Sequence, residues 1–348
     1  MGIPSHPGAR LKQASLRTLL LLAVAALSAG RLAGQDRTHV LLVVGLGGTA
    51  EFRESFHEEA STIYTALTEQ HGLPKEDVIY LGEHPEIAPD MISGESTRAN
   101  ILRVLGELSQ KVGPRDKVVV VLIGHGTDGP NGVQFNLPGP DLGPSDFELA
   151  MIAFPTQPLA LVATGSASGG FVEPLAGPNR VVIAATRTAR ERNATEFGRF
   201  FAEAMAGGGS DLDHDNRVSL LEAFTYAKQE VERYYEEQNE MQSEHAVLDD
   251  NGDGQGSTEA SLDGPDGIFA ATFTFGRGNG VEGPVTDDPA LAALLAERDE
   301  IQRQIEELRV VRDALTEDEY LARMEPLLVE MALKQREIDA AGGGGAPR

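Results

Sequence analysis

Runs of consecutive apolar residues recur along the first two thirds of the chain. Side chains of a strand point alternately to the two faces of a sheet, so an unbroken apolar run indicates a strand that helices cover on both faces. The sequence predicts strands of this kind at 39–44, 117–123, 159–163 and 180–185, with a shorter one at 77–81.

Between these runs the apolar residues recur every three or four positions, which is typical of amphipathic helices. This spacing predicts helices at 51–70, 97–112, 195–206 and 219–237, and Ser145 with Glu148 forms a capping box for another at 146–154. A final edge strand is expected at 267–275. Alternating strands and helices predict an α/β fold with a mainly parallel, doubly wound sheet.

Two of the predicted strands end in residues with chemical potential. The strand at 117–123 is followed by Gly124, His125 and Gly126, and the strand at 159–163 by the segment 164–170, which contains Ser166. Carboxyl ends of parallel strands share one edge of a sheet, where sites are usually built. A neutral imidazole can accept a proton from a hydroxyl, and the amides of Gly126 and Ser166 could stabilise an oxyanion. A polar loop residue and a small-residue turn explain the same letters equally well.

An apolar strand ending in His-Gly, then an apolar strand ending in a nucleophile, a spacer and Ser-Gly, resembles the caspase-like fold of the legumain, caspase and gingipain peptidases. The resemblance covers 38–275 and implies a three-layer sandwich in which His125 assists a nucleophile at position 166. Caspases place this histidine about 50 residues before their cysteine, and the spacing of His125 and Ser166 is comparable.

The sequence departs from this family at the positions that matter most. Ser166 stands where the family has cysteine, and Thr164 stands where an acidic residue is common. Legumains orient their histidine with an asparagine after the first strand, whereas this chain has the glycine-rich segment 45–48 there. A serine hydroxyl is a weaker nucleophile than a thiol and needs a well-oriented base. The resemblance therefore favours a peptidase homologue that binds peptide or protein without cleaving it. The alternative is a hydrolase with Ser166 as nucleophile and His125 as base.

The glycine-rich segment 45–48 allows another hypothesis, because glycines between a strand and a helix also occur in dinucleotide-binding sites. Glu51 and Glu54 open the helix where a pyrophosphate would have to lie, which favours a simple tight turn.

An acidic loop gives the sharpest chemical pattern in the chain. Asp211, Asp213, Asp215, Ser219 and Glu222 occupy positions 1, 3, 5, 9 and 12 of an EF-hand-type loop, and Arg217 offers its carbonyl at position 7. The pattern predicts bound calcium at 211–222. The alternative is a solvated loop whose Ser219 caps the following helix. The segment 249–254 begins a similar pattern, but position 12 is Ala260.

Charge and composition exclude several classes of function. The chain has 54 acidic and 29 basic residues, a formal charge of -25, which repels nucleic acid and anionic membranes. It has no cysteine, so disulfides, thiol catalysis and cysteine metal sites are ruled out.

The amino-terminal segment 1–34 is typical of a signal peptide, since basic residues precede a short apolar run that small residues follow. The mature protein is expected to be secreted or periplasmic, with no stable membrane span after cleavage.

The carboxyl-terminal segment follows a glycine-rich linker at 276–288. Leu294, Ile301, Leu308 and Leu315 fall seven apart, which predicts a helical hairpin or coiled coil at 289–340 that could self-associate. Pro326 is expected to kink or split its second helix. A single amphipathic helix packed on the sheet domain is the alternative, and 341–348 is expected to be a disordered tail.

Overall fold

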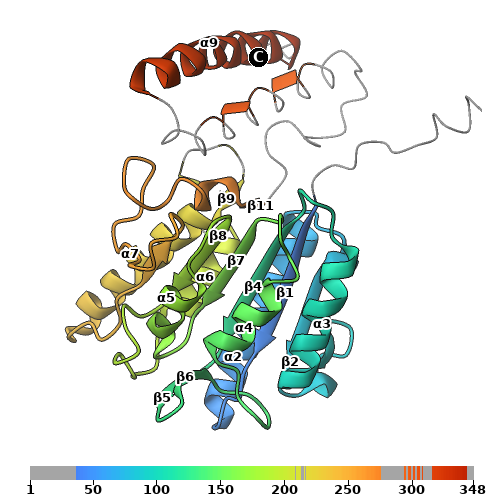
Figure 1. Ribbon diagram of the computed structural model, residues 1–348, viewed down its shortest axis with the longest axis vertical. Helices are drawn as coiled ribbons and strands as arrows, with labels where there is room; N and C mark the ends of the chain where they lie inside the picture. Colours follow the sequence, from blue (N-terminus) through green and yellow to red (C-terminus); the bar gives the residue numbers. More distant parts are fainter. Residues whose placement is uncertain are drawn as a thin grey trace, which may run out of the picture. The chain divides into compact units, whose positions relative to one another are not determined.

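The computed structural model describes residues 37–275 except 208, 213, 214 and 216, seven separate positions between 294 and 308, and residues 316–342. Residues 38–275 form an α/β fold, with a mainly parallel central sheet and helices on both of its faces (Figure 1), so the predicted fold class is confirmed. The predicted signal peptide at 1–34 and linker at 276–288 lie outside the described residues.

The central sheet has seven strands in the order β10-β8-β7-β4-β1-β2-β3. Only β10 is antiparallel to its neighbour. The strands are β1 (Thr38–Val44), β2 (Val78–Gly82), β3 (Ile92–Glu95), β4 (Lys117–Ile123), β7 (Leu159–Ala163), β8 (Arg180–Ala184) and β10 (Val247–Asp249). The chain runs outward from β1 to β3 and then returns to β4 on the other side of β1. The order therefore reverses between β1 and β4, the point at which doubly wound sheets usually bind ligands.

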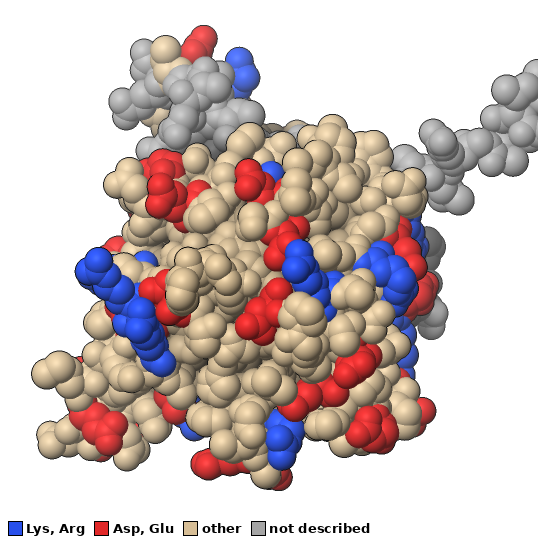
Figure 2. Space-filling model, turned by 60° about the horizontal axis from the view of Figure 1, so that its bottom comes forward, with Lys and Arg blue, Asp and Glu red and all other residues tan. Residues whose placement is uncertain are grey.

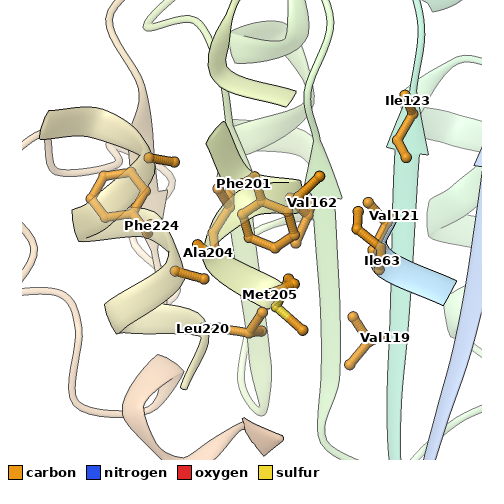
Figure 3. Packing of buried hydrophobic residues seen from close by; sticks show 14 of the residues in the cluster. Ile63, Val119, Val121, Ile123, Val162, Phe201, Ala204, Met205, Leu220 and Phe224 are labelled. Carbon is orange, nitrogen blue, oxygen red and sulfur yellow. The ribbon is translucent and has the colours of Figure 1, made fainter. Parts of the chain in front are cut away.

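Six helices cover the two faces of the sheet. One layer contains α2 (Ala50–Thr65), α6 (Phe197–Met205) and α7 (Leu220–Gln238); the other contains α3 (Arg98–Lys111), α4 (Pro144–Met151) and α5 (Val172–Leu175). Successive residues of β4 alternate between the layers: Val119 and Val121 pack toward α2 and α6 (Figure 3), whereas Val118 and Val120 pack on the opposite face. This two-sided burial explains why the strand is apolar at every position.

The edge strand expected at 267–275 is wrong. Only Thr274–Phe275 (β11) is a strand there, and it pairs with β9 (Val218–Ser219) in a separate two-stranded sheet. The amides of Gly267 and Ala270 donate to the carboxylate of Asp250, at 2.9 and 2.8 Å, and hold this part of the segment in turns. The edge position belongs to β10, whose three residues give too short a pattern to detect.

The capping box predicted for the helix at 146–154 is also wrong. Helix α4 begins at Pro144, two residues earlier, and the carboxylate of Asp146 accepts the amide of Gly143 at 3.0 Å. Proline fits the first turn of a helix because its missing N–H has no partner there. The helix predicted at 51–70 consists of α2 followed by a π-helical turn, Ala66–Gln70.

In the carboxyl-terminal segment, α9 spans Glu317–Gly342 with Pro326 inside it, so the proline does not split this helix. Ile301, Ile305 and Leu308 form a small buried cluster with Met324, and Lys334 pairs with Glu297 at 2.7 Å. The remaining residues of the predicted hairpin, and 343–348 of the predicted tail, lie outside the described residues. Across the described part of the chain, no helix combines the length and the apolar character that a membrane span requires.

Candidate functional site

The two candidate segments that follow β4 and β7 lie together at one edge of the sheet. The strands are neighbours, with Leu122 opposite Ala163. Their turns touch backbone to backbone: a Cβ added to Gly165 would lie 1.9 Å from the carbonyl oxygen of Gly124, and one added to Gly126 would lie 2.3 Å from that of Ser166. The glycines beside His125 and Ser166 therefore allow a close approach that no other residue would permit.

The hydroxyl of Ser166 bonds to the backbone of Gly126 at both of its functions. Its Oγ donates to the Gly126 carbonyl oxygen at 3.0 Å and accepts the Gly126 amide at 3.2 Å, and the side chain is 5% exposed. Its proton is thus committed to a carbonyl rather than to His125. The amide expected to stabilise an oxyanion is already occupied by the hydroxyl itself.

The imidazole of His125 packs edge-on against two aromatic rings of α2. Its centroid lies 4.4 Å from that of Phe52 and 4.9 Å from that of Phe56. Burial lowers the pKa of His125 below its ordinary value, so the ring is neutral at neutral pH. Within residues 37–275, as far as they are described, the ring makes no hydrogen bond.

The turn after β7 is braced by the loop after β8. Ala167 has a left-handed backbone with φ of 59°, and its amide donates to the carbonyl of Glu191 at 2.8 Å. The hydroxyl of Ser168 lies 3.2 Å from that of Thr186, which also accepts the amide of Gly169 at 2.8 Å. Ser168 is therefore a structural element of the turn.

A buried glutamate beneath this edge escaped the sequence analysis. Glu59 of α2 is 8% exposed, accepts the hydroxyl of Ser55 at 3.3 Å, and packs against the backbone of Gly198 close to Thr164. Burial raises the pKa of Glu59 to about 8, so it is mostly protonated at neutral pH. The signal was present, because Glu59 lies within the apolar stripe of its helix.

A second buried carboxyl, Glu244, caps the start of α6. It accepts the amides of Glu196 at 2.7 Å and Phe197 at 3.1 Å, and burial raises its pKa to about 7. Next to it, the ring of His245 lies 3.1 Å from the carboxylate of Glu191. Both groups support the loop after β8 rather than Ser166.

The loop after β8 gives this edge a basic rim, defined here as Arg187, Arg190 and Arg192. All three are exposed. Arg192 pairs with Asp128 at 3.0 Å, whereas Arg187 and Arg190 form no ion pair with any described residue. Figure 2, which brings forward the lower end of Figure 1, shows blue side chains among the red ones there. Such a rim is unusual in a chain with a formal charge of -25.

The glycine-rich segment after β1 forms a tight turn, as the sequence favoured. The amide of Gly47 donates to the carboxylate of Glu83 at 3.0 Å, and a Cβ on Gly45 would lie 2.5 Å from the carbonyl oxygen of Asn136. A carboxylate thus occupies an amide that a pyrophosphate would need.

The acidic loop at 211–222 brings part of the predicted calcium ligand set together. Asp211 accepts the amide of Asp215 at 3.0 Å, Asp215 that of Arg217 at 2.7 Å, and Glu222 that of Leu212 at 2.9 Å. Burial, with the charges of Glu222 and Asp211, raises the pKa of Asp215.

Ser219 and Glu222 also form the capping box of α7, which is the feature that the solvated-loop alternative requires. The described residues contain no group of three or more metal-ligating side chains. Asp213 lies outside them, and calcium binding stays a prediction. In 249–254, Asp249 accepts the amides of Gly252 and Gly254, at 3.2 and 2.6 Å, as turn chemistry predicts.

Comparisons with known proteins leave the family open. A scan against models of protein families finds no match, and a search of curated proteins finds none either. The mainly parallel sheet with helices on both faces is compatible with a caspase-like α/β fold, and this is as far as the fold identifies the chain.

Proposed function

We propose that the chain is an exported homologue of caspase- and legumain-type peptidases that binds a peptide at the carboxyl edge of its sheet without cleaving it. One observation carries this proposal: Ser166, at the position of the family's cysteine, has its hydroxyl bonded to both backbone functions of Gly126. A hydroxyl held in this way is a structural group.

The surroundings of His125 support the same conclusion. A serine nucleophile requires a base within hydrogen-bond reach, whereas His125 packs on Phe52 and Phe56 and makes no bond to Ser166. Cysteine is absent, so no thiol can replace the hydroxyl.

The basic rim indicates the chemistry of the peptide. Arg187 and Arg190 are exposed beside the turn that holds Ser166, and guanidinium groups bind carboxylates through paired hydrogen bonds. The proposed ligand is therefore a peptide with acidic side chains. Two further parts of the proposal are calcium in the loop 211–222 and self-association through 289–340.

Turnover assays separate this proposal from the hydrolase alternative. The mature chain, with and without calcium, is tested on a broad panel of peptides and esters beside Ser166→Ala and His125→Ala. The proposal predicts no turnover by any of the three proteins. Turnover by the wild type that both substitutions abolish would establish the hydrolase instead.

Peptide binding is tested with synthetic peptides of equal length that are acidic, neutral or basic. The acidic peptide should bind, and Arg187→Glu with Arg190→Glu should remove the binding. Lys75→Glu, an exposed charge reversal just before β2, is the control and should leave binding unchanged. Equal binding of all three peptides would contradict the assigned ligand.

The calcium loop and the carboxyl-terminal segment have separate tests. Calcium should raise the melting temperature of the wild type, and Glu222→Gln should abolish that rise, because a ligand that binds only the folded state stabilises it. Asp253→Asn, in the incomplete loop at 249–254, is the control. Deletion of 289–348 should reduce the mass of the particle per chain in light scattering if this segment drives self-association.

A further inference from the structure

A cavity of about 330 Å³ lies at the start of α7, between this helix, the acidic loop and the segment 260–274. Its apolar wall includes Leu221, Leu262 and Ile268, while Asp215 and Glu222 contribute carboxylates and Thr225 a hydroxyl. Its volume falls in the range of small-molecule sites, which combine an apolar lining with a few polar groups.

This cavity is separate from the edge that holds Ser166. Thr272 and Thr274 also line it, and the ammonium group of Lys117 donates to the carbonyl of Thr272. Lys117 begins β4, whereas His125 follows the end of that strand. The cavity therefore lies near the amino ends of the strands, opposite the candidate peptide-binding edge.

The charges on the cavity wall favour a cation. Asp215 and Glu222 share the wall, and Asp211 lies close enough to add its negative charge to theirs. Arg217 offsets only part of this charge. Like charges held together in a partly buried place repel one another, and a bound cation relieves this repulsion.

The apolar part of the wall selects the kind of cation. Leu262 on the rim is 40% exposed, so its side chain offers apolar surface to a ligand. A bare metal ion would leave this surface in water, whereas a hydrocarbon body would cover it.

We propose that the cavity binds a small organic cation, an ammonium or guanidinium group on an apolar chain or ring. The cationic group lies against Asp215 and Glu222, and the apolar body covers Leu221, Leu262 and Ile268. This site is independent of peptide binding at the opposite edge of the sheet.

Calorimetric titration of the mature chain tests the proposal. A calcium chelator is present throughout, so the outcome does not depend on the calcium loop. The probes are 2-phenylethylammonium, 2-phenylethanol and 3-phenylpropionate, which have similar bodies and different charges. The ammonium probe should bind about tenfold more tightly than the alcohol, the ratio that one charge-assisted hydrogen bond gives, and the carboxylate should not bind. Equal affinities for the three probes would overturn the proposal.

Variants locate the site. Thr225→Phe should fill the cavity and abolish binding. Thr68→Phe is its control, since both threonines donate to the carbonyl four residues earlier, each at 2.8 Å, but Thr68 does not line the cavity. Asp215→Asn, in the loop, should weaken the ammonium probe about tenfold even if the phenylalanine variant fails to fold. Unchanged binding in Asp215→Asn would place the cation elsewhere and refute the assignment.

A lysine-containing peptide, titrated beside the free amine, identifies the source of the ligand. A small-molecule site should bind the amine and not the peptide. Binding of the peptide alone would overturn the assignment to a small molecule.

Discussion

The carboxyl edge of the sheet and the cavity at the start of α7 contain similar numbers of reactive groups, yet they use them differently. At the edge, polar atoms satisfy each other: Ser166 bonds to Gly126, and Ser168 to Thr186. In the cavity, Asp215 and Glu222 bring like charges to a wall with apolar neighbours. Chemical residue types therefore indicate a site only when the fold leaves them work to do beyond holding the backbone.

The largest expected effect breaks the backbone contact at the carboxyl edge. Gly165→Ala places a Cβ 1.9 Å from the carbonyl oxygen of Gly124 and should lower the free energy of unfolding by about 3 kcal/mol in urea denaturation. Gly106→Ala, in α3 with no atom within 4 Å of the added Cβ, should instead stabilise by about 0.5 kcal/mol. Equal effects would show that the two turns are not tightly packed.

The next effect tests whether Ser166 is a structural group. Ser166→Ala leaves the buried amide and carbonyl of Gly126 without their hydroxyl partner and should cost about 2 kcal/mol. Ser109→Ala removes an exposed hydroxyl bond to the carbonyl of Gly106 and should cost far less. Similar losses of stability in the two variants would mean that the Ser166 bonds do not hold the edge together.

The pH dependence of stability tests the buried carboxyl beneath the edge. The pKa of Glu59 rises from 4.5 to about 8 on folding, so the folded state retains a proton that the unfolded state loses. Stability should therefore fall as pH rises from about 5 to about 8, by about 1 kcal/mol per pH unit. Glu244, with a pKa of about 7, adds to the same trend.

Glu59→Gln should flatten this slope, because glutamine can still accept the Ser55 hydroxyl but does not ionise. The exposed neighbour provides the control: Glu58→Gln should leave the slope unchanged. A slope that survives Glu59→Gln would show that another group causes it.

The smallest effect concerns the basic rim. Asp128→Asn breaks an exposed ion pair with Arg192 and should change stability by less than about 0.5 kcal/mol. The same change frees a third arginine, so an acidic peptide should bind more tightly in calorimetry. Weaker binding would mean that Asp128 itself contacts the ligand.

The sequence predicted the central strands and the edge that holds His125 and Ser166, because unbroken apolar runs and their following turns are local features. It did not predict β10, since three residues carry no detectable period. It also could not show the bonds of Ser166, which depend on how closely Gly126 approaches across two strands. The cavity escaped prediction because its walls come from three segments that only the fold brings together.

The state of Ser166 decides the central claim, and a serine-reactive fluorophosphonate measures it directly. The mature protein is incubated with the reagent and its intact mass is determined by mass spectrometry. The account predicts no adduct on Ser166, because its hydroxyl is buried and bonded to Gly126. An adduct that disappears in both Ser166→Ala and His125→Ala would contradict it and establish an activated serine.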